Sequence, residues 1–210
     1  MDYYQDITLL PDGEIALGFL WQKIYQQVHI ALVEQKVDDR HSAIALSFPE
    51  YGSRRFPLGT KLRVLASEIS QLERLNLAKF LTRFEDYMHM ESIQPVPENT
   101  TAVAFVRQQH KGQARIEKDI QSKAELWAKK SGKPLEDCLA ELDKTKPKAQ
   151  SNVPFVWMNS LQTQAANPDH SARFPLFIAR IEVPERNAGL FNCYGLSTKR
   201  GSEAATVPHF

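Results

Sequence analysis

The sequence predicts an α+β fold, and three observations along its 210 residues support this class. In the first half, segments with apolar residues at helical spacing alternate with short apolar runs typical of strands. A stretch containing Pro95 and Pro97 then separates this half from the rest. Beyond it, strand-like runs flank one long segment rich in lysine and arginine. We therefore expect a mixed first domain followed by a region with a basic helix and short strands.

The first two elements are a strand at residues 3–10 and a helix at residues 14–35. The strand ends at Pro11-Asp12-Gly13, a typical turn sequence. The helix is predicted because its apolar residues recur three or four positions apart, which places them on one face. These apolar residues are Leu17, Leu20, Trp21, Ile24, Val28, Ala31 and Leu32.

Four further elements complete the first half. Residues 43–48 and 62–66 are predicted strands, residues 67–80 a second amphipathic helix, and residues 84–90 a fourth strand. The resulting β-α-β-β-α-β order is the ferredoxin-like arrangement, in which two helices cover one face of an antiparallel sheet. The open face of such a sheet is a common RNA-binding platform. We predict a ferredoxin-like domain at residues 1–94.

The second half begins with a proline-containing linker at residues 93–100 and forms a second predicted domain, residues 95–210. A strand at residues 102–106 precedes a helix at residues 112–130 and a short helix at residues 134–142. Two strands, at residues 154–158 and 174–183, are predicted to pair, and the tail after Gly189 is short-stranded or irregular.

Positive charge is concentrated between Arg107 and Lys133, where eight basic and three acidic residues give a net charge of +5 in a chain whose total is +1. Lys111, Arg115 and Lys118 share one helical stripe, because they are spaced i, i+4, i+7. A second stripe is apolar: Ile116, Ile120, Ala124 and Trp127. A helix with an apolar back and a basic front suits a phosphate backbone. A solvated helix of mixed charge is the alternative.

Composition limits the class of protein. Apolar residues make up 42% and charged residues 24%, as in globular domains. Cys138 and Cys193 are too few for a disulfide framework and lack zinc-site spacing, which favours a cytoplasmic setting. The acidic start does not resemble a signal peptide, and no apolar stretch is long enough to span a membrane. No Asp, Glu or His cluster has metal-ligand spacing, so we expect neither metal nor cofactor.

Short motifs at both ends of the chain point to a family. At the start they are Met1-Asp2-Tyr3-Tyr4, Pro11-Asp12, His29 followed by Ala31-Leu32-Val33, Ser47-Phe48-Pro49 and Leu62-Arg63-Val64. At the far end they are Val153-Pro154-Phe155-Val156, Ser160, Phe174-Pro175-Leu176-Phe177-Ile178, Cys193-Tyr194-Gly195-Leu196-Ser197 and Val207-Pro208-His209-Phe210. In this order they resemble the type I-F CRISPR RNA-processing endoribonucleases, the Csy branch of the Cas-six family.

This resemblance implies an N-terminal ferredoxin-like domain and a C-terminal RNA-binding region. It also implies cleavage of precursor CRISPR RNA at the base of the repeat stem-loop, without a metal, by attack of a ribose 2′-hydroxyl on the adjacent phosphate. The protein would then stay on the cut hairpin and join the other subunits of the type I-F surveillance complex. It would have no membrane partner.

Three residues match the catalytic positions of that family. His29 matches the general base, a role that suits imidazole because its pKa is near 6.5. Ser160 matches the serine that positions the 2′-hydroxyl, and Tyr194 matches a tyrosine that orients the histidine. Without the resemblance, the residues alone favour ordinary structural roles. His29 is then a histidine packed at a helix end, Ser160 a local backbone hydrogen-bonder, and Tyr194 a core aromatic beside a glycine.

The resemblance also assigns RNA contacts. Arg107 and Gln109 match an Arg-x-Gln pair that reads base edges near the foot of the hairpin. Phe174 matches an aromatic that stacks on the terminal base pair, although it is otherwise an ordinary strand residue. Gln162 stands where the family has a second serine. The basic helix matches one that grips phosphates, here through Lys111, Arg115, Lys118 and Lys123.

Two rival functions remain at this point. The first is a non-cleaving RNA-hairpin-binding subunit of a CRISPR ribonucleoprotein, against which His29 argues. The second is a protein–protein adaptor without RNA, against which the basic segment and the Arg107-x-Gln109 pair argue. Salt-independent binding would favour the adaptor.

Overall fold

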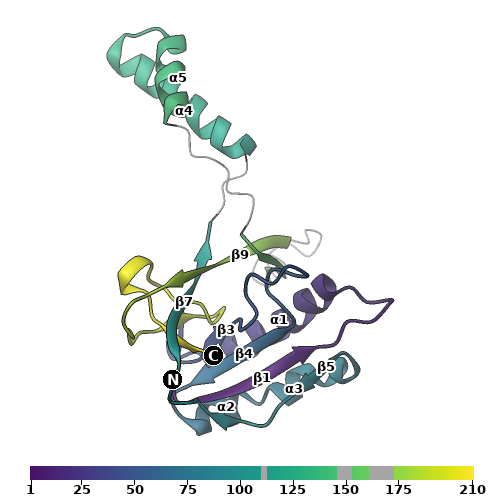
Figure 1. Ribbon diagram of the computed structural model, residues 1–210. Coiled ribbons are helices and arrows are strands. Elements are labelled where there is room, and N and C mark those ends of the chain that lie inside the picture. Colours follow the sequence, from purple (N-terminus) through teal and green to yellow (C-terminus); the bar gives the residue numbers. More distant parts are fainter. Residues whose placement is uncertain (110–112, 146–152, 161–172) are drawn as a thin grey trace. The chain divides into compact units, whose positions relative to one another are not determined.

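The computed structural model describes residues 1–109, 113–145, 153–160 and 173–210. The chain forms two compact units, one of Met1–Gln108 with Pro154–Phe210 and the other of Gln109–Val153. The first unit contains both helices and sheets, and the described part of the second is helical (Figure 1). This mixture confirms the predicted α+β class. The division into residues 1–94 and 95–210 stays a prediction.

The first sheet is centred on β1 (Tyr3–Leu9). This strand pairs antiparallel with β4 (Lys61–Ala66) on one side and with β5 (Met88–Met90) on the other. β3 (Ala45–Ser47) pairs with β4, so the strand order is β3-β4-β1-β5. The predicted linker contributes β6 (Gln94–Pro95), which pairs with the start of β1.

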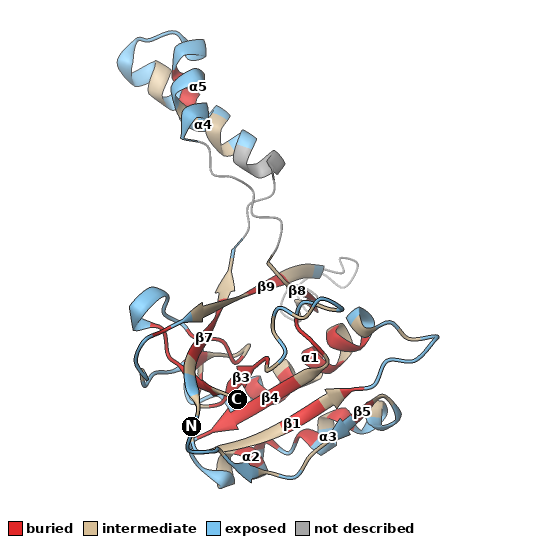
Figure 2. Ribbon diagram, in the orientation of Figure 1, coloured by how far each residue is buried: buried red, intermediate tan, exposed pale blue. Residues whose placement is uncertain are grey.

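Helix α1 (Leu17–Glu34) packs its apolar stripe into the core of this unit. Of the seven apolar residues predicted to face inward, all except the half-buried Leu17 are buried (Figure 2). The helix begins later than residue 14 because an Asp12 carboxylate oxygen accepts the backbone N–H groups of Glu14 and Ile15, at 2.8 and 2.7 Å. That turn holds the preceding residues out of the helix.

Two predicted elements differ in the structure. The helix expected at residues 67–80 breaks at Asn76 into α2 (Ile69–Leu75) and α3 (Leu77–Leu81). Asn76 has φ = 44°, a left-handed conformation that asparagine tolerates better than most residues. The strand expected at residues 84–90 is only β5, because Thr82–Tyr87 form a 3-10 helix, η1. Its Glu85-Asp86 pair is unfavourable in a strand.

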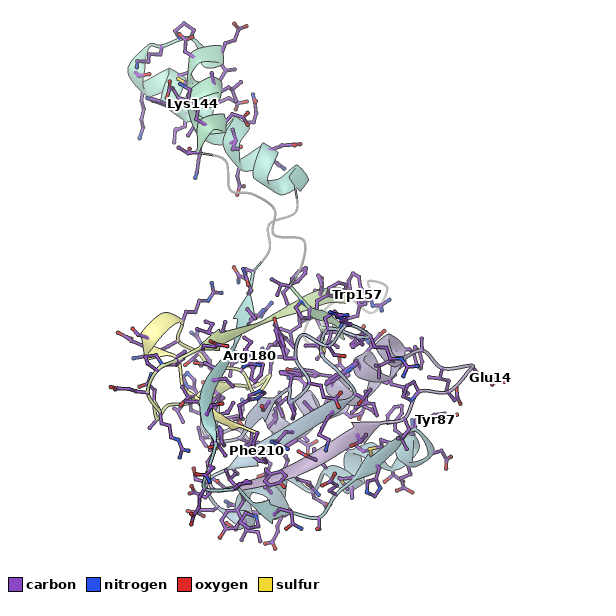
Figure 3. The ribbon with its side chains drawn as sticks, viewed as in Figure 1. Glu14, Tyr87, Lys144, Trp157, Arg180 and Phe210 are labelled. Carbon is purple, nitrogen blue, oxygen red and sulfur yellow. The ribbon has the colours of Figure 1, made fainter. Side chains whose placement is uncertain are left out.

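The second sheet has the antiparallel order β11-β7-β9-β8, and its members are β7 (Thr101–Gln108), β8 (Phe155–Asn159), β9 (Arg173–Glu182) and β11 (Val207–His209). The predicted pairing of the strands now seen as β8 and β9 is confirmed, and Trp157 and Arg180 mark these strands in Figure 3. One face of this sheet adds Phe105, Met158 and Ile178 to the core of the first sheet.

The C-terminal tail returns to the N-terminal part of the chain. β10 (Phe191–Asn192) pairs antiparallel with β2 (His41–Ser42), and a short 3-10 helix, η2 (Gly201–Glu203), follows. The strand predicted at residues 43–48 corresponds to β3, whereas β2, just before it, was not predicted and joins a different sheet. The pairing of β10 with β2 brings residues after position 192 to the end of α1.

The second unit is a helical hairpin of α4 (Gln113–Ser131) and α5 (Leu135–Lys144), which agrees with the two helices predicted there. Ala124 on α4 and Cys138 on α5 are its fully buried residues within the described part. Gly132 ends α4 with φ = 69°. Lys118 and Lys123 are exposed, whereas the predicted inward residues Ile120 and Trp127 are half-buried.

Candidate active site

His29 lies in the third quarter of α1, one residue after the buried Val28. Its Nδ1 lies 2.8 Å from the carbonyl oxygen of Cys193. A carbonyl oxygen can only accept, so Nδ1 carries the hydrogen in this bond. The neutral ring therefore has its lone pair on Nε2, the atom that can accept a proton from a substrate.

The ring of Tyr194 stacks on His29, with 4.4 Å between ring centroids and 11° between ring planes. Tyr194 is held through its backbone. Its N–H donates to Oδ1 of Asn192 at 2.8 Å, and the hydroxyl of the buried Tyr25 donates to its carbonyl oxygen at 2.8 Å. Tyr25 and His29 both lie on α1, so this one helix carries the His29 ring and also holds the backbone of Tyr194, whose ring stacks on it.

The turn that carries Tyr194 also requires a glycine at the next position. Gly195 has φ = 70°, a backbone conformation that residues other than glycine rarely adopt. A Cβ at this position would also overlap the side chain of Leu46. The Gly195 carbonyl accepts the N–H of Leu46 on β3, at 2.8 Å. The turn thus packs directly against β3 of the first sheet.

Burial shifts the pKa values of both His29 and Tyr194. Removal from water lowers the pKa of His29 from its ordinary value of 6.5, and the hydrogen bond to Cys193 opposes this only partly. Burial raises the pKa of Tyr194, opposed by the positive charge of Arg107. Near neutral pH, His29 is therefore neutral and able to act as a base, while the Tyr194 phenol keeps its proton.

Arg107 and Phe174 extend this cluster. The guanidinium carbon of Arg107, on β7, lies 5.5 Å from the ring centroid of Tyr194 and 5.4 Å from that of Phe174. Phe174, on β9, meets Tyr194 edge to face, with 6.4 Å between centroids and 81° between planes. The Arg107 backbone carbonyl accepts a hydrogen bond from Arg200 at 2.7 Å. Four predicted residues, including His29, thus form one continuous group.

Ser160 follows the last residue of β8 and is half-buried. The preceding residue, Asn159, donates its backbone N–H to Oε1 of Gln26 at 2.9 Å, and its carbonyl accepts from Nε2 of Gln26 at 3.5 Å. Gln26 lies on α1, three positions before His29. The structure therefore attaches the strand end that carries Ser160 to the helix that carries His29.

The remaining predicted RNA contacts lie in the helical unit or outside the described residues. Gln109 is exposed and belongs to the helical unit, as do the exposed Lys118 and Lys123. Arg115 lies in the first turn of α4, but its side chain is outside the described residues. Lys111 and Gln162 lie entirely outside them.

Sequence patterns did not reveal the groups that hold the site together. The Cys193 carbonyl is a backbone atom, which no residue pattern marks. Gln22, Gln26 and His29, however, are polar residues spaced i, i+4, i+7, so they share one stripe of α1. Gln22 accepts a hydrogen bond from Arg173 at 2.6 Å. That polar stripe beside an apolar one was visible in the sequence.

Three further observations concern metals, membranes and thiols. Within the described ranges, no three His, Cys, Asp or Glu side chains gather in a group able to hold a metal ion. The helices in that same part of the chain include none with the length and apolarity needed to cross a bilayer. Cys138 and Cys193 are both free thiols.

Comparison with known proteins gives consistent matches over nearly the whole chain. Residues 4–210 match the family described as CRISPR-associated protein (Cas_Csy4). A CRISPR-associated endonuclease Cas6/Csy4 from Pseudomonas aeruginosa is 30% identical over 200 residues, covering 94% of this chain and 96% of that protein. A protein of the same name from Escherichia coli is 27% identical over 213 residues, covering 100% of both chains. This chain belongs to the Cas_Csy4 family of CRISPR-associated proteins.

Proposed function

We propose that this protein is a metal-independent endoribonuclease that cleaves precursor CRISPR RNA at the base of the repeat stem-loop. The observation that carries the proposal is the arrangement of His29, whose Nδ1 is bonded to the Cys193 carbonyl at 2.8 Å and whose ring is stacked on Tyr194. This arrangement leaves Nε2 as the proton acceptor. The two relatives named as endonucleases support cleavage, not mere binding.

The proposed reaction needs only groups of this chain, the RNA and water. His29 Nε2 takes the proton of the ribose 2′-hydroxyl, and Ser160 holds that hydroxyl in line with the adjacent phosphate. The 2′-oxygen forms a bond to phosphorus as the bond from phosphorus to the 5′-oxygen breaks. The 5′-oxygen leaves with a proton, supplied by water or by the protonated His29. The products are a 2′,3′-cyclic phosphate and a 5′-hydroxyl.

Phe174 and Arg107 are proposed to set the cleavage register. Phe174 stacks on the terminal base pair of the stem, and Arg107 beside it reads a guanine edge with its two-pronged guanidinium. Gln109 reads a neighbouring base. Their support is the contact of Arg107 with both Phe174 and Tyr194, which joins the base-reading group to the proposed catalytic group.

The helical unit is proposed to grip phosphates of the stem through Lys118 and Lys123, with Lys111 and Arg115 adding contacts. Gln162, which is not part of this unit, is proposed as a further RNA contact. We further propose that the first sheet and its helices are a ferredoxin-like domain, which the strand order β3-β4-β1-β5 supports.

After cleavage, the protein stays on the cut hairpin and joins the other subunits of the type I-F surveillance complex. Two free thiols are compatible with a reducing cytoplasm.

The deciding experiment is single-turnover cleavage of a cognate repeat hairpin in excess EDTA. Wild-type protein should cut at the hairpin base and leave a 2′,3′-cyclic phosphate. His29→Ala should bind the hairpin but cut about 10²–10⁴-fold more slowly, the usual contribution of a general base. His89→Ala, at an exposed histidine on β5, is the matched control and should cut like wild type.

Two results would contradict the proposal. Cleavage that disappears in EDTA and returns with a divalent metal would disprove metal independence. Salt-dependent hairpin binding by a wild-type protein that never cuts would instead identify a non-cleaving hairpin-binding subunit.

A further inference from the structure

Gln26 is a buried polar residue on α1, with 8% of its surface exposed. Its amide makes two hydrogen bonds to Asn159, the last residue of β8: it accepts the Asn159 N–H at 2.9 Å and donates to the Asn159 carbonyl at 3.5 Å. The shorter bond holds the backbone at the end of β8 against α1, and the longer, weaker one orients the Gln26 amide along the strand.

The opposite side of the same strand pair is also attached to α1. Asn159 pairs with Arg173 across the β8–β9 ladder, and Arg173 Nη2 donates to Oε1 of Gln22 at 2.6 Å. Gln22 lies one turn before Gln26 on the same stripe that leads to His29. The helix therefore holds both members of one cross-strand pair.

We propose that Gln26 is a positioning residue that sets the distance and orientation of Ser160 relative to His29. This inference rests on the proposed function, because it needs Ser160 to hold the 2′-hydroxyl that His29 deprotonates. Ser160 is one peptide unit from Asn159, a step of about 3.8 Å between Cα atoms, so a bond to Asn159 limits how far Ser160 can move. Misplacement by about 1 Å can reduce a rate ~10²-fold.

The test measures single-turnover cleavage rate and hairpin affinity separately. Gln26→Leu removes both hydrogen bonds at similar volume, and we expect it to cut roughly 10- to 100-fold more slowly with affinity unchanged. Gln26→Glu keeps an acceptor for the shorter bond but turns a carboxylate oxygen toward the Asn159 carbonyl, so it should recover only part of the rate. Gln27→Leu is the matched control and should cut like wild type, because Gln27 makes no side-chain hydrogen bond to the described residues.

A double-mutant cycle with Ser160→Ala distinguishes positioning from general support of the fold. If Gln26 acts through Ser160, the double variant should cut no more slowly than Ser160→Ala alone. Multiplied effects would show that Gln26 acts elsewhere, and a wild-type rate for Gln26→Leu would overturn the inference while leaving the proposed function intact. A wild-type protein that does not cut would overturn both.

Folding is checked by thermal unfolding of every variant. If Gln26→Leu does not fold, Gln26→Asn replaces it, because this variant keeps a buried amide but is one methylene too short for both bonds. A folded Gln26→Asn with the wild-type cleavage rate would equally reject the inference.

Discussion

The imidazole of His29 lies flat against the phenol ring of Tyr194, with 4.4 Å between their centroids and 11° between their planes. This stack restrains rotation of the histidine about its side-chain bonds, while the hydrogen bond to Cys193 fixes which nitrogen carries the proton. Orientation and tautomer are thus controlled by two adjacent residues of one turn.

Tyr194 should act through its ring. Tyr194→Phe keeps the stack, so we expect single-turnover cleavage within about threefold of wild type. Tyr194→Leu removes the stack, which contributes roughly 0.5–1.5 kcal/mol by itself, and should slow cleavage about tenfold or more. A loss in Tyr194→Phe as large as that in Tyr194→Leu would instead assign the role to the hydroxyl.

Cleavage should depend on pH through His29. In the proposed mechanism the neutral ring is the base, so the rate should rise with pH and level off once the ring has lost its proton. Because burial lowers the pKa of His29, the midpoint of this rise should lie below 6.5. A rate profile with its midpoint above 6.5 would contradict a buried base at this position.

The same shift has a consequence for stability. The folded protein binds the His29 proton less readily than the unfolded chain, so the free energy of unfolding increases with pH from the folded pKa up to about 6.5 and then stays level. His29→Gln should lack this portion of the pH dependence in urea unfolding. An unchanged dependence in that variant would assign it to another group.

Gly195 should be more sensitive to substitution than a glycine of similar conformation elsewhere. Gly195→Ala and Gly201→Ala both force alanine into a left-handed conformation, which costs about 1–2 kcal/mol. Only the former also overlaps Leu46, which adds ~1–3 kcal/mol. Urea unfolding should rank the two variants in this order, and Gly195→Ala should also slow cleavage. Equal destabilisation would mean that Leu46 moves aside freely.

The lysines of α4 should contribute to RNA affinity through charge. Replacing Lys118 and Lys123 with glutamine should weaken hairpin binding and reduce the slope of log affinity against log salt by about 1 per lost phosphate contact. Lys144→Gln on α5 is the control, because Lys144 is already paired with Glu141 at 2.6 Å. An unchanged slope in the double variant would favour a merely solvated helix.

The sequence predicted the elements whose apolar spacing is regular. The predicted inward face of α1 agrees with the structure because apolar residues at helical spacing lie on one side of the helix, and that side is buried in the core. The break at Asn76 was missed because apolar spacing continues through it, and a single left-handed residue leaves no periodic trace. β2 was not predicted because it is a strand of two residues that exists through its pairing with β10, a segment far along the chain.

The candidate site was predictable as a set of residue types but not as a geometry. His29, Arg107, Phe174 and Tyr194 were each named from family motifs, and the structure brings all four together. The contacts between them depend on tertiary pairing. Gln26 was missed because a glutamine on a helix is ordinarily a solvated residue, and only its burial against Asn159 distinguishes it.

The acceptor that fixes the His29 tautomer is the carbonyl of Cys193, an atom that every amino acid supplies. Catalytic histidines oriented by a carboxylate lose that partner when one codon changes. Here a substitution at position 193 alters the thiol, which lies 3.6 Å from the Arg40 carbonyl, and leaves the acceptor in place. The hydrogen bond that sets the His29 tautomer is therefore robust to substitution of the residue that supplies its acceptor, and it is vulnerable to changes that reshape the turn.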